Sequence, residues 1–238
     1  MDRSKTPEMA TALINDTPPD ASTAASPCES TPFPLPPEDT PWPKPLFTTP
    51  RLTIRPYHPS DALEIARLAN SHAIARNMTT RFPHPYTLAD AKNFMSRALN
   101  PKDSGTYAWV ISLSPTGLPI GGCGLDPGSV DQEGTAEIGY WLGEEYWGKG
   151  YGSEMCTALT AYAFGLERGI EGDRIPLVRV GATVTGGNVA SGNVLVKCGY
   201  RHEGTLRRIV WRLGERKDLE MYGLLREEWE EVRANSNR

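Results

Sequence analysis

The sequence predicts a mixed α/β domain in which one layer of sheet is flanked by helices. After residue 50, strand-like and helix-like segments follow in the order β-α-α-β-β-β-α-β-α-β-β, which is typical of this fold class. The length of 238 residues suits one domain of moderate size or two small ones. Because no apolar run reaches the roughly 18 residues that a membrane span needs, we expect no membrane partner.

The first 50 residues differ in composition from the rest of the chain. They contain 12 of the 21 prolines, none of the 23 glycines, and seven Asp or Glu against three Lys or Arg. This predicts a disordered tail over residues 1–48, because the segment lacks the apolar periodicity that offsets ordering entropy. Proline clusters at 33–37 and 41–45 leave open a docking peptide for a protein partner. The remaining residues balance in charge, which gives no reason to expect a nucleic acid.

The N-terminus and the cysteines favour a cytoplasmic protein, with a nuclear one as the alternative. The chain opens without the apolar segment of a secretory signal. Neither the histidines nor the four cysteines have metal-ligand spacing, so we expect reduced thiols and no metal. A cysteine nucleophile with a histidine base stays open, because such partners meet only in the fold.

The body begins with a strand and two helices. Residues 51–55 alternate as a strand does. Ser60 or Asp61 can cap the first helix, and Thr87 and Asp90 resemble a capping pair at the start of the second. The expected inward residues are Leu63, Ile65, Ala66, Leu68 and Ala69 in the first helix, and Phe94, Met95, Ala98 and Leu99 in the second.

Three strands and a long helix follow. Residues 107–113 and 120–125 form a predicted hairpin, and residues 135–142 form a third strand. A helix is expected from about 150 to 167, because apolar residues recur there at helical spacing. These residues are Met155, Leu159, Tyr162, Ala163 and Leu166.

The last elements are a strand, a short helix, a hairpin and a charged end. The strand spans 177–184, and the next helix is capped by Asn188 and ended by Gly199. A hairpin within 204–225 comes next, and the chain after Arg226 is expected to be helical.

A glycine-rich turn before the long helix is the central motif. It reads YWGKGYGSE over residues 146–154. Glycines at alternate positions let successive backbone amides point into one concavity, and the helix adds its positive end, so the turn suits a phosphate or pyrophosphate. A plain tight turn is the structural alternative. The glycines match neither a Walker loop nor G-x-G-x-x-G, which argues against kinase-like and dinucleotide sites.

The same segment resembles a family signature. Trp147-Gly148-Lys149-Gly150-Tyr151-Gly152 looks like the pyrophosphate-binding Q/R-x-x-G-x-G/A of the GNAT superfamily of acetyl-CoA-dependent N-acetyltransferases, with Trp147 replacing Gln or Arg. Residues 188–200, NVASGNVLVKCGY, resemble N-x-x-S-x-x-(V/L)-x-x-K-x-G-(F/Y) of the branch that acetylates N-termini of ribosomal proteins. The opening TPRLTIRP at 49–56 also fits, so the resemblance covers residues 49–230.

The resemblance implies a mostly antiparallel sheet with a splayed central strand pair, flanked by helices. The strands at 137–142 and 178–184 would part to admit acetyl-CoA as co-substrate. The acetyltransferase domain would span 49–232, with a C-terminal end at 233–238. A fixed amide at the splay would stabilise the oxyanion formed on attack. The implied cofactor-binding residues are Tyr140, Trp141, Leu142, Trp147, Gly148, Lys149, Gly150, Tyr151, Gly152, Ser153, Asn188 and Ser191.

Glu137 and Ser191 are the candidate catalytic residues. An alkylammonium must lose a proton before it attacks, and Glu137 stands where some relatives carry a glutamate base. Its structural alternative is a salt bridge or a sheet-surface charge. Ser191 would protonate the leaving thiolate, because Leu195 stands where many relatives place a tyrosine. Its alternative role is to reinforce the start of its helix.

The amine acceptor is expected between the loop at 81–86 and the terminal hairpin. Phe82, His84, Tyr86 and Trp211 would wall this site, although core packing is the simpler explanation for any one of the aromatics. The predicted function is an acetyl-CoA-dependent N-acetyltransferase in which a primary amine attacks directly in a ternary complex. A protein N-terminus and a small molecule, such as an aminoglycoside, polyamine or amino acid, both remain open as acceptors. A non-catalytic CoA-binding module is the alternative from another class.

Overall fold

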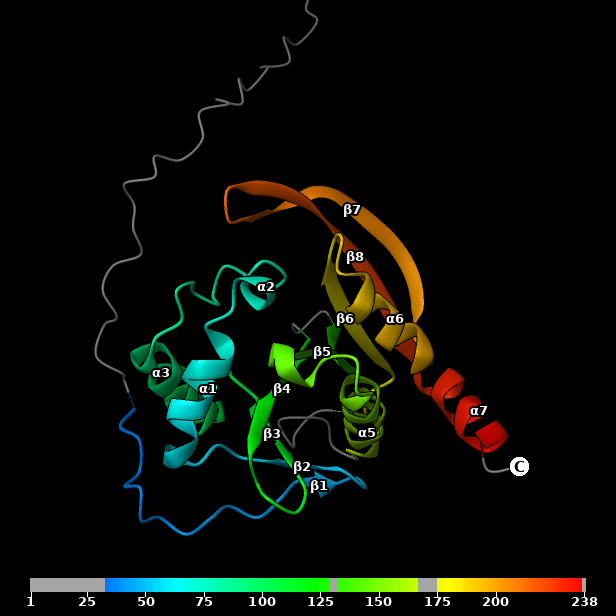
Figure 1. Ribbon diagram of the computed structural model, residues 1–238. Helices are drawn as coiled ribbons and strands as arrows, with labels where there is room; N and C mark the ends of the chain where they lie inside the picture. Colours follow the sequence, from blue (N-terminus) through cyan, green and yellow to red (C-terminus); the bar gives the residue numbers. More distant parts are fainter. Residues whose placement is uncertain (1–32, 129–131, 167–174, 237–238) are drawn as a thin grey trace, which may run out of the picture. The chain divides into compact units, whose positions relative to one another are not determined.

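The computed structural model describes residues 33–128, 132–166 and 175–236. Its centre is an eight-stranded sheet with strand order β1-β2-β3-β4-β5-β6-β8-β7 (Figure 1). Only β5 and β6 pair in parallel, so the predicted mixed, mostly antiparallel sheet is confirmed. The strands are β1 (Phe47–Thr48), β2 (Leu52–Arg55), β3 (Ala108–Leu113), β4 (Pro119–Pro127), β5 (Thr135–Leu142), β6 (Arg179–Thr185), β7 (Arg201–Arg212) and β8 (Glu215–Leu225).

The helices lie at the predicted places, with additions. Thr87 and Asp90 form a reciprocal capping box at α3, and Asn188 accepts a hydrogen bond from the Ser191 amide at the start of α6. The one-turn helices α2 and α4 were not predicted, because four residues carry no readable periodicity. No helix in the described part of the chain is long and apolar enough to cross a membrane. The helices are η1 (Pro59–Asp61), α1 (Ala62–Ala69), α2 (His72–Ala75), α3 (Leu88–Ala98), α4 (Pro101–Ser104), η3 (Glu144–Tyr146), α5 (Tyr151–Gly165), α6 (Val189–Lys197) and α7 (Arg226–Ser236).

The helices cover both faces of the sheet and enclose two apolar clusters. Helices α1 and α3 lie on one face, and α5 and α6 lie on the other (Figure 1). Met155 and Leu159 of α5 are fully buried on their side, as is Met95 of α3 on the opposite side. Leu63 was expected to face inward and is 71% exposed, because α1 turns Ala62 rather than Leu63 toward the core.

The cap before α1 differs from the prediction. Ser60 caps nothing through its side chain, and His58 instead accepts a hydrogen bond from the Ser60 amide. Asp61 is buried, receives the Arg55 guanidinium through two hydrogen bonds of 2.8 and 2.9 Å, and accepts from the His58 amide. The carboxylate therefore neutralises a buried arginine, and this use excludes it from capping α1.

Residues 33–48 belong to the folded unit, although they were expected to be part of the tail. The Trp42 ring stacks on His58 at 4.0 Å, and the Arg55 guanidinium lies 4.7 Å from the Trp42 ring centre. β1 pairs with β2. These contacts offset the ordering entropy of a segment without periodicity. The rest of the expected tail, residues 1–32, lies outside the described residues, and at the other end α7 continues past the expected boundary at residue 232.

The central strands part as the resemblance implied. β5 and β6 pair only through Thr135–Glu137 and Arg179–Gly181. Beyond Glu137, β5 continues along β4, and β6 continues along β8. A gap therefore opens between the strands, with the helices α5 and α6 on one face and the α1 side on the other.

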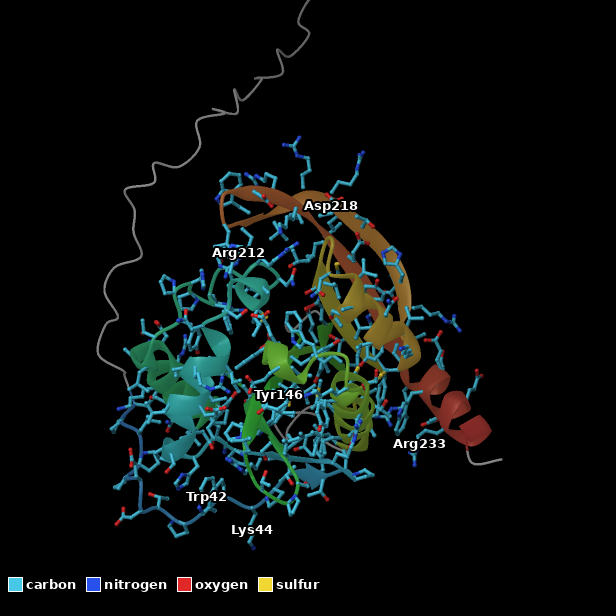
Figure 2. The ribbon with its side chains drawn as sticks, viewed as in Figure 1. Trp42, Lys44, Tyr146, Arg212, Asp218 and Arg233 are labelled. Atoms are coloured by element: carbon cyan, nitrogen blue, oxygen red, sulfur yellow. The ribbon has the colours of Figure 1, made fainter. Side chains whose placement is uncertain are left out.

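The β7–β8 hairpin arches past the splayed strand ends and is fastened to the α2 region (Figures 1 and 2). Arg212, near the hairpin tip, donates to the carbonyl oxygens of Ala75 and Phe82 at 2.6 and 2.7 Å. Thr185, at the end of β6, donates to Asn77 O at 3.0 Å. The Arg212 side chain is buried at this contact, and the burial lowers its pKa.

Candidate active site

The glycine-rich turn leads from β5 through η3 into α5. Gly148 and Gly150 have φ of 71° and 81°, which L side chains rarely adopt. Gly150 is the N-cap of α5 and supplies no side-chain cap, in contrast to Thr87 of α3 and Asn188 of α6. No side-chain cap therefore occupies the first amides of α5, and amides in this arrangement have the chemistry that a pyrophosphate needs.

A buttress under this turn was not predicted from the sequence. We define it as Arg51, Glu154 and Thr49. Arg51 donates from Nε to Glu154 at 2.6 Å and from Nη1 to Lys149 O at 2.9 Å, and its guanidinium lies 4.7 Å from the Tyr151 ring centre. Thr49 Oγ1 and the Arg51 amide also donate to Glu154 Oε1. Burial raises the pKa of Glu154, but these hydrogen bonds outweigh it and the net pKa is lowered.

The remaining residues of the predicted cofactor site surround the turn. Trp147 is 45% exposed and donates from Nε1 to Leu142 O at 2.8 Å, which ties the turn to the end of β5. Leu142 is buried in the core. Gly152 lies where an added Cβ would come within 3.5 Å of Val194 in α6, so the two helices approach closely here. The Ser153 carbonyl accepts from Cys198 at 3.5 Å.

Glu137 lies where the splay begins. Its side chain is exposed, and Thr183 of β6 donates to Glu137 Oε1 at 2.5 Å across the strand gap. Its neighbours Ala136 and Ile138 are buried under the α5 side, so alternation directs Glu137 to the opposite face. The carboxylate thus faces the α2 side of the gap, with one oxygen fixed by a hydroxyl from the facing strand.

Ser191 lies on the other face of the sheet. Its hydroxyl is hydrogen-bonded to Tyr140 Oη at 3.1 Å, and its amide donates to Asn188 Oδ1 at 3.3 Å. Burial raises the pKa of Tyr140, so the phenol keeps its proton and can donate to Ser191. Leu195 is fully buried in the core and offers no acid. The Tyr140 hydroxyl was missed as a partner, because the sequence does not show which face of α6 meets β5.

The structure brings together only part of the predicted acceptor wall. Phe82 contacts Tyr86 at 4.8 Å and Trp141 at 5.9 Å between ring centres, and Tyr86 is buried. His84 Nδ1 is buried and has no hydrogen-bond partner within the described ranges. Trp211 does not lie beside Phe82, His84 and Tyr86. It precedes Arg212 on β7 and therefore points to the opposite face of the strand, where it is 42% exposed and packs under Arg216.

Among the described residues, no group of three or more His, Cys, Asp and Glu side chains is arranged to hold a metal ion. Glu137 and Tyr140 are two titratable groups at the splay, and they lie on opposite faces of β5. The arrangement can therefore accept a proton on one face and donate one on the other.

Comparisons with known proteins agree with this geometry. The family described as "Acetyltransferase (GNAT) domain" matches residues 51–201. "Putative ribosomal N-acetyltransferase YdaF" of Bacillus subtilis is 37% identical over 183 residues, which cover 75% of this chain and 93% of YdaF. A GNAT-family acetyltransferase structure from Bacillus anthracis superposes with a TM-score of 0.63 at 24% identity, covering 76% of this chain and 98% of the other.

A second solved structure is that of RimL, described as a ribosomal L7/L12 α-N-protein acetyltransferase in complex with CoA. It has a TM-score of 0.62 at 19% identity, with 76% of this chain and 98% of RimL covered. At this identity the similarity concerns the fold. The family match, the identity to YdaF and the splayed sheet lead to one conclusion: the chain belongs to the GNAT family of acetyl-CoA-dependent N-acetyltransferases.

Proposed function

We propose that this enzyme acetylates the α-amino group of a protein or peptide N-terminus by direct attack in a ternary complex with acetyl-CoA. The splay carries the proposal, because it separates a carboxylate on one face, Glu137, from a hydrogen-bonded hydroxyl pair on the other, Tyr140 and Ser191. A reaction that removes a proton from an amine and returns one to a thiolate needs these two groups on opposite sides of the acyl carbon.

The cofactor-binding roles follow from the donors at the turn. Acetyl-CoA supplies the acetyl group in the activated form of a thioester. The amides of residues 150–153 would bind its pyrophosphate at the uncapped start of α5, and the buttress would keep Lys149 and Gly150 in place. Backbone groups of residues 140–142, beyond the last β5–β6 pair, would hold the pantetheine arm and the acetyl carbonyl.

Glu137 is assigned as the base that accepts the proton of the acceptor ammonium. The hydroxyl of Thr183 fixes Oε1, which leaves Oε2 to accept from the amine or from an intervening water. Attack is then favoured by orientation as much as by basicity, because the carboxylate holds the amine beside the gap.

Ser191 is assigned as the donor to the leaving thiolate. The neutral Tyr140 phenol can donate to Ser191 Oγ, so the serine proton is free to point toward sulfur. The start of α6 adds a positive dipole at the same place.

Two observations support a peptide acceptor. The first is the identity to YdaF, which is named as a ribosomal N-acetyltransferase. The second is the surface on the Glu137 face, where the Phe82 ring borders Trp141, and His84 has an unpartnered buried nitrogen among the described residues. An extended chain end offers a side chain to the rings and peptide groups to a histidine nitrogen.

The test is thiol release by the full-length protein with three classes of acceptor. These are peptides with free N-termini, the same peptides with N-acetylated ends but an internal lysine, and a panel of polyamines, amino acids and aminoglycosides. We expect turnover with the free N-termini alone, a product acetylated at the first residue by mass spectrometry, and intersecting double-reciprocal plots. Turnover with the small amines alone would contradict a peptide acceptor and would identify the acceptor as a small-molecule amine. Parallel double-reciprocal plots would exclude the direct-attack mechanism. CoA binding without thiol release from acetyl-CoA, for every acceptor, would favour a non-catalytic module.

A further inference from the structure

Two thiols meet where α6 ends against α5, beside Ser153 and close to Tyr140. Cys198 is the C-cap of α6, and its Sγ lies 3.4 Å from Thr157 Oγ1 and 3.5 Å from Ser153 O, on one face of α5. Cys156 belongs to α5 and is fully buried. The Cys156 and Cys198 thiols are hydrogen-bonded to each other. Neither was singled out from the sequence, because 41 residues separate them.

The two thiols differ in ionisation and exposure. The hydrogen bond from Cys156 lowers the pKa of Cys198 to about 7, against the opposing effect of burial, and Thr157 adds a further donor. The same contact, together with burial, raises the pKa of Cys156. Cys198 is partly exposed, whereas Cys156 is not. A partly exposed thiol of lowered pKa with a second thiol beside it is the arrangement found at cysteines that undergo reversible oxidation.

Cys123 provides the internal contrast. It is buried at 4% exposure, and burial alone raises its pKa. Among the three described cysteines, Cys198 alone combines partial exposure with a lowered pKa. This difference between Cys198 and the other two cysteines follows from how α6 packs against α5, and the spacing of the cysteines in the sequence does not predict it.

We propose that Cys198 is a thiol–disulfide exchange site for low-molecular-weight disulfides and that Cys156 resolves the adduct, giving a disulfide that links α5 to α6. In the first step the Cys198 thiolate attacks one sulfur of the small disulfide. The Cys198 S–S bond forms, the original S–S bond breaks, and one small thiolate leaves. In the second step Cys156 gives its proton to solvent and attacks the Cys198 sulfur, which releases the second small thiolate. Two protein thiols are oxidised, one small disulfide is reduced to two thiols, and the released protons end on those thiols.

The experiment uses the full-length protein with Cys28→Ser, because Cys28 lies outside the described residues and would add a fourth thiol. The protein is incubated with glutathione disulfide under argon, quenched with an alkylating agent, and measured by intact mass and peptide mapping. We expect a product lighter by two hydrogen atoms, with Cys156 and Cys198 in one linked peptide pair. The initial rate should rise through a midpoint near pH 7, the pKa of the Cys198 thiol.

Two variants in the same background separate the roles. Cys156→Ser keeps a hydrogen-bond donor but cannot resolve the adduct, so glutathione should stay on Cys198. Cys123→Ser is the matched control, and it should give the same linked product as the parent. A parent protein that retains glutathione on Cys198, or in which Cys198 stays unmodified while circular dichroism shows a folded chain, would overturn the proposal.

Discussion

Replacing Arg51 with methionine removes the guanidinium of the buttress while keeping the length of its side chain. Two side-chain hydrogen bonds are lost, one to Glu154 and one to Lys149 O. The Arg51 side chain is 48% exposed, and an ion pair at that exposure contributes about 0.2–1 kcal/mol. A hydrogen bond to a backbone carbonyl contributes about 1 kcal/mol. Without these contacts the turn is no longer held in its binding conformation, and CoA must restore that conformation when it binds. The combined loss of about 1.5 kcal/mol then weakens CoA binding by about tenfold.

The assay is isothermal titration of CoA into the full-length protein. We expect Arg51→Met to raise the Kd of CoA by about tenfold while the KM of the amine stays unchanged, because the buttress contacts the turn and not the acceptor face. Arg201→Met is the matched control. Arg201 pairs with Glu228 at 2.8 Å between β7 and α7, so its loss should leave CoA binding unchanged.

A second variant distinguishes positioning from direct phosphate contact by Arg51. Glu154→Gln keeps the guanidinium and removes the carboxylate that orients it. If Arg51 acts by holding the turn, Glu154→Gln also weakens CoA binding. If Arg51 instead binds phosphate directly, removal of a nearby negative charge strengthens binding. An Arg51→Met protein that binds CoA as tightly as the parent would refute the reasoning altogether.

Glu137→Gln is expected to lower kcat in the thiol-release assay by about 10²- to 10⁴-fold with CoA affinity unchanged, and an unchanged kcat would remove the base assignment. Thr183→Val preserves the shape of its side chain but loses its hydrogen bond to Glu137, so kcat should fall by about tenfold. Tyr140→Phe and Ser191→Ala remove the two sides of one hydrogen bond. Their combination should reduce kcat no further than Ser191→Ala alone, and additive losses would contradict a shared role. Arg212→Met deletes two hydrogen bonds from a buried side chain, and the free energy of unfolding by denaturant should fall by about 2–3 kcal/mol. An unchanged denaturation midpoint would show that the hairpin is held by other contacts.

Elements whose residues contact one another locally could be predicted from the sequence. Apolar alternation gave the bounds of β5 at 135–142, and side-chain chemistry gave the capping box of Thr87 and the cap of Asn188. These signals are local, because periodicity and capping depend on residues within one or two turns. The same locality explains the failures. The inward face of α1 was wrong at Leu63, since the tilt of a helix on the sheet is not encoded in its own period. Residues 33–48 were assigned to a tail, although Trp42 finds its partner in His58.

The sequence by itself determined the glycine-rich turn at the start of α5, where Gly148 and Gly150 have positive φ, because glycine φ angles and the first amides of a helix need no distant partner. Which side chains work together was decided by the tertiary structure. Arg51 meets Glu154 across 103 residues, Tyr140 meets Ser191 across 51, and Thr183 meets Glu137 across 46. Each pair depends on the strand order or on how a helix packs against the sheet. These arrangements follow from burying apolar surface over the whole domain, and no local pattern specifies them.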